Sequence, residues 1–395
     1  MILAKMQRKK PVLLLLGIFI FVFICTFKAF EAPDGRVGKS SKRFNLTLTN
    51  ASLLSHHTAT VSNTASPIDT EFLILQYTTY FGKYFKESFS RCAYNNCRLA
   101  TNKLLLNISD VILLSTRNLL EGLPPRRSYN QLWIAITRES PFNNHLRRYA
   151  NVTFNATATY SKRSEILFDY GATVKRANPK TYKYNPRMYN KTRAVAWLVS
   201  HCKKQSNRMW YAKELSRYIK VDIFGACGRL KCPRNRKLNL YKDPCLKRIE
   251  DKYKFYLSFE NSLCEEYATE KIWKILTRNI VPVVLGAADY SHILPPHSYI
   301  DVANFSHPSK LAKYLKLVAS SDELYGQYFE WKRTYRVSPH DTPEMLCNVC
   351  KYVNTNHRSP HVKAIKMNKF WNAKRHCISP NTYFSGMNTY SNKTI

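Results

Sequence analysis

Short apolar runs alternate with helix-like segments through the second half of the chain, and this alternation constrains the fold most. Residues 194–200 (AVAWLVS), 254–260 (KFYLSFE) and 281–286 (VPVVLG) have the composition of buried strands. Between them, residues 206–219 and 269–278 have the apolar spacing of amphipathic helices. Strands that alternate with helices favour parallel sheets with helices on both faces. The pattern therefore predicts an α/β fold.

The first half follows the same pattern less regularly. Three strands are expected there, at 71–77, 110–116 and 132–137. Residues 175–193 are basic, contain proline and show no periodicity, which is typical of a domain boundary. With 395 residues, the chain has room for two domains of ordinary size. We expect two α/β domains, 69–185 and 186–355, that face each other across a ligand-binding cleft.

The N-terminus has the pattern of a membrane anchor. Several basic residues precede an apolar run at 12–27, which is short for a membrane span and long for a signal-peptide core. No small-residue cleavage site follows, and the basic flank is expected to stay cytoplasmic. We interpret 1–11 as a cytoplasmic tail and 12–27 as a transmembrane signal anchor, with a cleaved signal peptide as the alternative. Residues 28–68, rich in Ser, Thr, Asn and His, are typical of a flexible lumenal stem, and 356–395 form a C-terminal tail.

N-glycosylation sequons also favour a lumenal body. A sequon asparagine can carry a glycan only in a chain that enters the secretory pathway. The chain has eight candidate N-glycosylation sites: Asn45, Asn50, Asn107, Asn151, Asn155, Asn190, Asn304 and Asn392. This number exceeds what chance usually gives in a chain of this length.

The cysteines lead to the same conclusion. Of eleven cysteines, Cys25 lies in the apolar run, and the other ten are an even number suited to disulfides in an oxidising compartment. The alternative is a zinc site at the C-x-x-C of residues 347–350, but no second C-x-x-C or H-x-x-x-H completes a set of four ligands. Two N-terminal cysteines paired with two late ones would tie the ends of the body together. The candidates are Cys92, Cys97, Cys347 and Cys350.

The net charge of +36 raises the question of nucleic-acid binding. Lys and Arg are spread along the whole chain, however, with no basic helix, zinc finger or RNP-type aromatic motif. A lumenal body would also not meet nucleic acid. We interpret the charge as a solvated basic surface, with attraction to anionic lumenal ligands or membranes as a second interpretation. A polyanion-binding protein is the alternative to an enzyme.

The segment FYLSFENSLCEEYATEKIWK (255–274) places polar residues at the end of a strand and the start of a helix, where α/β proteins bind ligands. Thr269 can cap the helix, while free backbone N–H groups and Lys271 suit phosphate. The Glu270 carboxylate suits sugar hydroxyls instead. The mixture favours a nucleotide sugar, and no glycine-rich phosphate loop occurs elsewhere in the chain. The alternative is an ordinary capped helix, and Glu265 and Glu266 are expected to face solvent.

The same segment, followed by VPVVLG and LPPHSYIDVANFSHPSKLAKYL, closely resembles the donor-binding signature of the α1,3-fucosyltransferases. Upstream, LWIAITRESP resembles the acceptor-side motif of that family, and the resemblance runs from about residue 72 to 352. It implies a GT-B-like fold of two Rossmann-like domains, GDP-fucose as the donor substrate, and a single-pass type II protein of the Golgi membrane with a lumenal catalytic domain.

The resemblance also implies roles for individual residues. Glu139, in Glu-Ser-Pro, corresponds to the proposed general base. The groups on the diphosphate correspond to Arg208 and Lys271, and those around the nucleotide and fucose to Asn261, Tyr267 and Glu270. The implied reaction is an inverting displacement of GDP by an acceptor hydroxyl. No D-x-D triplet lies at a strand end, so no protein-bound metal is predicted, and a stimulatory role for Mn²⁺ stays open.

The acceptor is expected to be the innermost GlcNAc of glycoprotein N-glycans. The cysteines of VDIFGACGRLKC and the tail ending in FWNAKRHC resemble those of invertebrate and plant core-type enzymes. A Lewis-type enzyme that acts on antennary GlcNAc is the alternative. Two departures from the family pattern add a third reading, a catalytically weak glycan- or polyanion-binding member. The helix after Lys271 is one residue shorter than usual, and Ser161 and Arg163 stand where relatives usually carry Arg and Asp.

Overall fold

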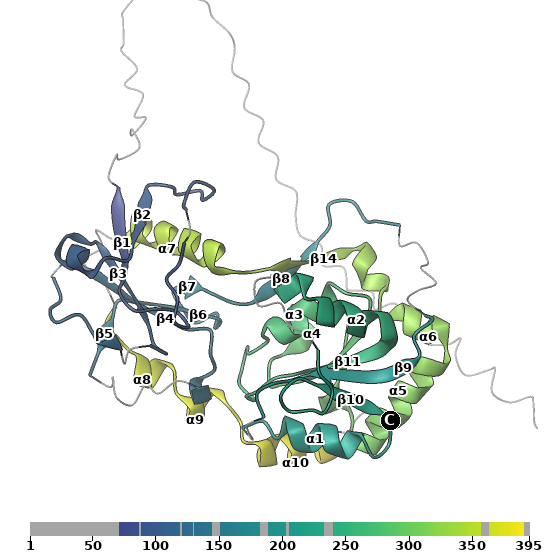
Figure 1. Cartoon of the computed structure of the whole chain (residues 1–395). Helices are drawn as coiled ribbons and strands as arrows, with labels where there is room; N and C mark the ends of the chain where they lie inside the picture. The colour runs from purple at the N-terminus through teal and green to yellow at the C-terminus, as the bar shows by residue number, and fades with distance from the viewer. Residues whose placement is uncertain are drawn as a thin grey trace, which may run out of the picture. The chain divides into compact units, whose positions relative to one another are not determined.

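Two parallel sheets form the framework of the chain (Figure 1). The computed structural model describes residues 71–390 except 87, 119–120, 129, 144–150, 182–188, 203–204, 233–239 and 357–362. The expected anchor and stem, and the sequons at Asn45, Asn50 and Asn392, lie outside the described residues. Within the described part, no helix is both long and apolar enough to cross a membrane.

The first sheet has six strands, all parallel, in the order β2-β1-β3-β4-β6-β7. Their bounds are β1 Phe72–Gln76, β2 Cys97–Ala100, β3 Val111–Ser115, β4 Leu132–Ile136, β6 Ala156–Thr159 and β7 Ile166–Leu167. Every residue of β1, β3 and β4 is buried. Strands covered on both faces need continuous apolar runs, and the sequence provides them here.

Segments from the end of the chain cover both faces of this sheet. Helix α7 (Thr342–Asn356) packs on one face, where Val349 and Val353 join Ile74 and Leu113 in one cluster. Figure 1 shows α7 beside β1 to β3, from which it is more than 200 residues away in the sequence. The opposite face packs against α8 (Met367–Phe370) and the residue that follows it, Trp371. The first half of the chain therefore depends on residues after 340 for its core.

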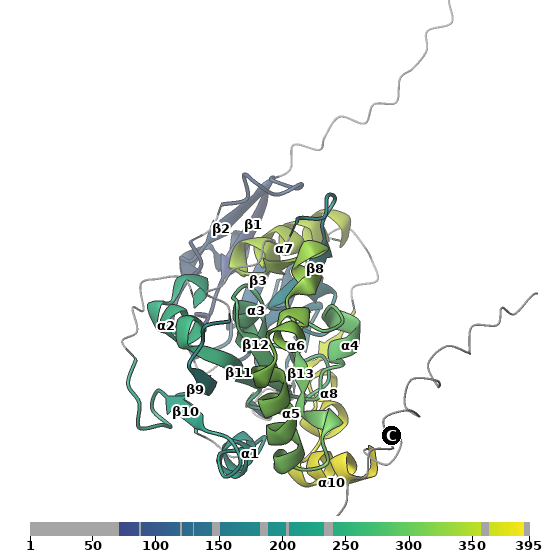
Figure 2. The same ribbon diagram turned by 90° about the vertical axis from the view of Figure 1, so that its right-hand side faces the viewer.

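The second sheet has five parallel strands in the order β10-β9-β11-β12-β13. Their bounds are β9 Arg193–Leu198, β10 Val221–Phe224, β11 Tyr253–Phe259, β12 Val281–Leu285 and β13 Ile300–Asp301. On one face pack α1 (Arg208–Leu215) and α5 (Pro308–Ser320), which Figure 2 shows with α10. On the other lie α2 (Pro244–Lys252) and α3 (Glu270–Leu276). The predicted α/β fold with parallel sheets is confirmed.

The remaining elements are short. The helices are α4 Tyr290–Ile293, α6 Asp322–Gln327, α9 Ala373–His376 and α10 Pro380–Tyr390, with 3-10 helices at Lys103–Ile108, Pro141–Asn143, Leu240–Lys242, Val302–Asn304 and Glu330–Arg333. Two antiparallel pairs complete the structure: β8 (Gly171–Lys175) with β14 (Tyr335–Pro339), and β5 (Thr153–Phe154) with β15 (Ile365–Lys366). The predicted domain limits stay a prediction, although α7, which the second domain was expected to include, packs on the first sheet.

Ten cysteines form five disulfides, as their even number predicted. The pairs are Cys92–Cys347, Cys97–Cys350, Cys202–Cys227, Cys232–Cys245 and Cys264–Cys377. The first two span 255 and 253 residues and attach α7 to the first sheet. Because they lie next to each other, either bridge alone closes almost the same long loop.

Removing one of these two bridges should therefore lower the free energy of unfolding by less than half as much as removing both. With Cys97 and Cys350 changed to Ala, the other bridge still closes the long loop, and we expect a loss of about 2–3 kcal/mol in the free energy of unfolding. Removing both bridges opens a loop of more than 250 residues and should cost about 5–8 kcal/mol. Urea unfolding of the oxidised variants measures both losses. Equal losses would show that the two bridges do not share one loop.

Candidate active site

A cavity of about 460 Å³ lies where loops from both halves of the chain meet. Its walls are formed by Arg117, Glu139, Phe142, Asn143, Tyr170, His201, Gln205, Arg208, Asn261, Tyr267, Glu270 and Lys271. All six residues predicted from the sequence to act in catalysis or donor binding are among them: Glu139, Arg208, Asn261, Tyr267, Glu270 and Lys271. The structure therefore brings together residues that are up to 132 positions apart, because Glu139 and Lys271 share one cavity.

The direction of the strands explains this convergence. Glu139 follows the end of β4, His201 and Arg208 follow β9, and Asn261 and Lys271 follow β11. The carboxyl ends of parallel strands lie at one edge of a sheet, and the loops there form the binding crevice of α/β proteins. Each sheet thus contributes its carboxyl edge to the cavity.

Lys271 is held by a group of polar contacts. Its Nζ lies 2.9 Å from Glu260 Oε2 and 3.4 Å from Glu270 Oε1, and it donates to Thr269 Oγ1 at 2.6 Å. Glu260 is fully buried, whereas the Lys271 side chain is 22% exposed. Glu260 also accepts from the Thr269 backbone N–H at 2.8 Å, and Thr269 caps α3 as the sequence predicted. The start of α3 and the Lys271 ammonium are fixed by the same buried carboxylate.

The charges of this group depend on one another. Burial raises the pKa of the Glu260 carboxyl, and the nearby Lys271 ammonium opposes that rise. Burial acts to lower the pKa of Lys271, but Glu260 and Glu270 outweigh it and the pKa is raised. Burial also acts to raise the pKa of Glu270, but Lys271 and Lys274 hold it at about 2. At neutral pH the cavity wall therefore carries the Lys271 cation beside an ionised Glu270.

Arg208, the first residue of α1, is only 3% exposed, and its guanidinium group is hydrogen-bonded to two backbone carbonyls. It donates from Nη1 to the Phe259 carbonyl at 2.9 Å and from Nη2 to the His201 carbonyl at 2.7 Å. Its buried Nε finds no hydrogen-bond partner among the described residues, and neither does the buried Oδ1 of Asn261. Buried polar atoms are normally satisfied, so this pair of a donor and an acceptor in the cavity wall fits a polar ligand.

Glu139 enters the cavity from the first sheet. Its carboxylate lies 3.6 Å from Arg117 Nη1 and accepts from Asn143 Nδ2 at 3.0 Å. The side chain is 18% exposed, so a ligand in the cavity can reach it. Its backbone carbonyl accepts a hydrogen bond from Trp371 Nε1 at 3.1 Å. A carboxylate held in this way, with access to the cavity, can accept a proton from a bound hydroxyl group.

The expectation that Glu265 and Glu266 face solvent holds for Glu265 but is wrong for Glu266, which is half-buried. Glu266 accepts from Ser161 Oγ at 2.6 Å, and Glu265 lies 3.3 Å from His376 Nδ1, although it is largely exposed. No sequence pattern indicates these contacts, since each joins residues more than 100 positions apart. The cap residue of α1 is Asn207, and Ser206 before it donates to the Glu260 carbonyl.

Sequence reasoning also left several cavity residues unidentified. Glu260, which pairs with Lys271 but does not line the cavity, has no role assigned from the sequence, although a carboxylate directly after a buried strand is itself a signal for a paired charge. Arg117, Asn143 and Tyr170 belong to connections where no motif is apparent. Among the described residues, no group of three or more His, Cys, Asp or Glu is placed to hold a metal ion.

Two family models match the chain. "Fucosyltransferase, N-terminal" matches residues 69–171, and "Glycosyltransferase family 10 (fucosyltransferase) C-term" matches residues 188–370. The first match covers the sheet that carries Glu139, and the second covers the sheet that carries Arg208 and Lys271. Residues after 370 lie beyond both matches.

Individual proteins agree with these matches. The chain is 37% identical over 253 residues to glycoprotein 3-alpha-L-fucosyltransferase A of Drosophila melanogaster, a match that covers 62% of this chain and 48% of that protein. The chain thus spans about half the length of this relative. It is 32% identical over 312 residues to 4-galactosyl-N-acetylglucosaminide 3-alpha-L-fucosyltransferase 9 of Bos taurus, covering 76% of this chain and 83% of that protein.

The fold has a solved counterpart. A crystal structure of an α1,3-fucosyltransferase superposes with a TM-score of 0.50 at 15% identity, covering 77% of this chain and 95% of that chain. At this level of identity the likeness concerns the fold alone.

The buried ion pair of the cavity can be tested by stability. Glu260→Gln keeps the shape of the side chain but leaves Lys271 without the closer of its two carboxylate partners. We expect a loss of about 3 kcal/mol in the free energy of unfolding, as for other broken buried pairs. Glu270→Gln removes a more exposed partner and should cost less than about 1 kcal/mol. Urea unfolding at pH 7 measures both, and a larger loss for Glu270→Gln would contradict the assignment.

Proposed function

The chain belongs to the fucosyltransferases of glycosyltransferase family 10, and we propose that it transfers L-fucose from GDP-β-L-fucose to a GlcNAc hydroxyl of glycoprotein N-glycans. One observation carries the proposal. A single cavity holds an accessible carboxylate, Glu139, from the first half and two cationic side chains, Arg208 and Lys271, from the second. This is what transfer from an anionic nucleotide sugar to a hydroxyl group requires. We further propose that the two halves correspond to the two domains of a GT-B-like enzyme.

The donor is proposed to lie against the second sheet. Lys271 and the Nε of Arg208 would contact the diphosphate, where positive charge stabilises the GDP leaving group as it departs. Asn261 Oδ1 offers a buried acceptor for a hydroxyl or N–H group of the donor. Glu270, kept ionised by its low pKa, would accept from sugar hydroxyls, and Tyr267 would form the wall beside them. Any stimulation by Mn²⁺ would act through the donor diphosphate, and its addition or chelation during transfer tests this role.

Transfer itself is proposed to invert the anomeric centre. The acceptor hydroxyl attacks the anomeric carbon on the face opposite GDP, the bond to the diphosphate oxygen breaks, and Glu139 accepts the hydroxyl proton. The product is an α-linked fucoside, and the leaving electrons remain on GDP. A positioned general base typically contributes ~10²–10⁴ in rate.

The acceptor is proposed to be the innermost GlcNAc of an N-glycan. The Drosophila relative is named as an enzyme that acts on glycoproteins, and this supports the core reaction. The Bos taurus relative is named for a galactosyl-N-acetylglucosaminide, and it matches more of the chain. Antennary GlcNAc is therefore the second candidate. A panel of core and antennary acceptors with labelled fucose, followed by linkage analysis, distinguishes the two.

A lumenal location in the Golgi membrane, as a type II protein, completes the proposal. Five disulfides suit an oxidising compartment. The described sequons Asn107, Asn151, Asn190 and Asn304 are exposed and therefore available for glycosylation. Asn155 is less accessible, because its Oδ1 accepts from the Trp133 backbone N–H at 2.7 Å. Glycosidase treatment of the chain from an animal-cell membrane fraction tests the topology.

The role of Glu139 gives a direct test. Glu139→Gln keeps the hydrogen bond from Asn143 available but cannot accept a proton, so kcat should fall about 100-fold or more. Thermal stabilisation by GDP should stay unchanged, because Glu139 lies on the opposite half from the proposed diphosphate contacts. Glu71→Gln, an exposed carboxylate of the first half that does not line the cavity, is the matched control. Normal turnover by Glu139→Gln would refute the assignment.

A further inference from the structure

The C-terminal segment 363–390, named here the C-terminal strap, contacts both halves of the candidate site. Most of it lies beyond the family match, which ends at residue 370. It contains β15, α8, α9 and α10. None of its residues lines the cavity. The strap can therefore act on the reaction only through residues that do line the cavity.

Its first half is anchored on the first sheet. Ile365 pairs with Phe154 in the antiparallel contact of β15 with β5, and Met367 is fully buried. Trp371 is 3% exposed and packs edge-on against Tyr160, with ring centroids 5.0 Å apart. From this position its indole Nε1 donates to the backbone carbonyl of Glu139 at 3.1 Å. The indole thus fixes the backbone of the proposed base.

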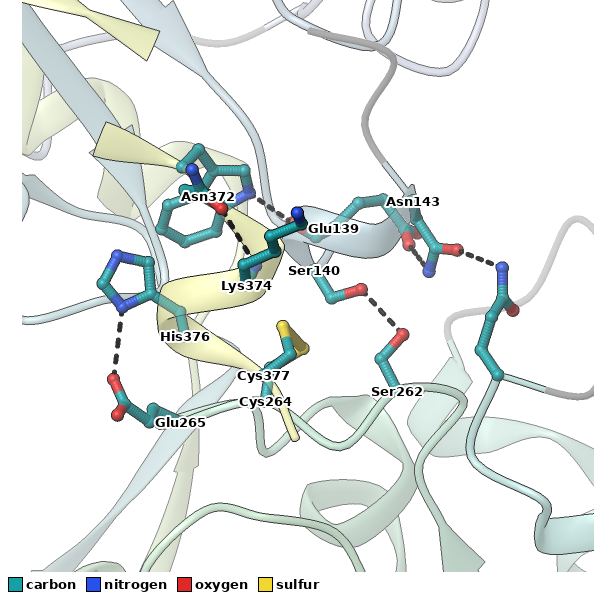
Figure 3. The surroundings of a disulfide bond; sticks show 12 residues. Glu139, Ser140, Asn143, Ser262, Cys264, Glu265, Asn372, Lys374, His376 and Cys377 are labelled. Atoms are coloured by element: carbon teal, nitrogen blue, oxygen red, sulfur yellow. Dashed lines mark hydrogen bonds and ion pairs between the residues drawn. A yellow bond between two sulfur atoms is a disulfide. The ribbon is translucent and has the colours of Figure 1, made fainter. Parts of the chain in front are cut away.

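Its middle part is attached to the loop that follows β11. Cys377 forms a disulfide with Cys264 (Figure 3). The bridge is flanked by two backbone hydrogen bonds, from Glu265 N to His376 O at 2.8 Å and from Ile378 N to Leu263 O at 2.9 Å. This loop carries Asn261 and Tyr267 into the cavity. The strap therefore holds the donor-side loop as well as the base.

Direct contacts between the halves lie beside the strap. Ser140, next to Glu139, donates to Ser262 Oγ at 2.7 Å, and both side chains are fully buried (Figure 3). Ser161 donates to Glu266, and Arg163 contacts His376 of the strap. Ser161 and Arg163 are the two positions where the sequence departs from the usual family pattern. Their side chains now have partners on the donor-side loop and on the strap.

We propose that the C-terminal strap is a positioning element for fucose transfer. Trp371 sets the position of Glu139, and the bridge from Cys377 to Cys264 sets the loop that bears Asn261 and Tyr267. Displacement of a catalytic group by about 1 Å can cost ~10²-fold in rate, so a fixed distance between base and donor loop matters. This inference rests on the proposed function, because it concerns the geometry of the same transfer.

Trp371→Phe tests the acceptor side of the strap. The substitution keeps an aromatic ring in the core but removes the N–H group that holds the Glu139 carbonyl. In the full-length chain we expect kcat to fall about fivefold, the equivalent of one hydrogen bond, while KM for GDP-fucose stays within about twofold. If Trp371 had a purely structural role, the substitution would lower the amount of folded enzyme. At equal active-site concentration, kcat would then stay at the wild-type value.

Trp331→Phe is the matched control. Trp331 is also buried, at 7% exposed, and does not line the cavity, so its kcat should equal that of the wild type. An unchanged kcat in Trp371→Phe would overturn the acceptor-side part of the proposal. So would an equal fall in both tryptophan variants.

A double variant, Cys264→Ala with Cys377→Ala, tests the donor side. Freeing the loop that carries Asn261 and Tyr267 should weaken GDP binding about fivefold, read from the dependence of the melting temperature on GDP concentration. Removing the Cys232–Cys245 bridge, whose cysteines do not line the cavity, should leave GDP binding unchanged. Wild-type GDP affinity in the first double variant would overturn the donor-side part.

The two readouts separate this inference from the proposed function. If the wild type transfers no fucose to any acceptor, the proposed function fails, and the strap is judged by GDP binding alone. If the wild type is active and Trp371→Phe retains its full kcat, the positioning role of Trp371 fails while the function stands. If the cysteine variant does not fold, the kcat of Trp371→Phe decides whether the strap is a positioning element.

Discussion

The contact between Glu260 and Lys271 is the interaction on which the candidate site depends. Glu260 has no exposure to solvent, and a buried carboxylate is tolerated only when it is paired and hydrogen-bonded. Lys271 supplies the charge, and Thr269 supplies both a backbone N–H and a hydroxyl group. One buried acid thereby sets the end of β11, the start of α3 and the direction of the ammonium group. In a chain of net charge +36, this acid is needed to place a cation rather than to add negative charge.

Much of the framework could be predicted because parallel strands buried on both faces must be apolar throughout. β3 and β12 are such runs and were expected within one residue of their ends. β6 (ATAT) and β7, which has two residues, were missed because they are too short or too polar for a periodic signal. The place of α7 was indicated by the disulfide candidates Cys347 and Cys350, which pair with Cys92 and Cys97 as expected, and not by its apolar face. Its apolar face requires burial, but nothing in that face specifies which of the two sheets it covers.

The candidate site was also predictable only in part. Residues inside a contiguous motif, such as Glu270 and Lys271, were identified through the resemblance and do line the cavity. What each atom contacts was not predictable, because the partners come from distant segments. Arg208, expected on a diphosphate, uses one N–H of each Nη group on a backbone carbonyl, while its buried Nε has no partner among the described residues. Glu266 turned out to be a partner of Ser161, a contact that depends on the two halves meeting.

A site shared by two sheets depends on what fixes one sheet to the other. The chain passes between the sheets near residue 169 and returns near 340, where His340 contacts Asp169 and Arg138 donates to the carbonyls of both residues. Two adjacent crossings alone would leave the halves free to rotate about them, and such a rotation would change the cavity most on the side away from the crossings. The Cys264–Cys377 bridge and the Trp371 hydrogen bond to Glu139 lie away from those crossings in sequence and restrict that rotation. The C-terminal strap therefore supplies the constraint that the two crossings lack, and it does so at the residues proposed to carry out the transfer.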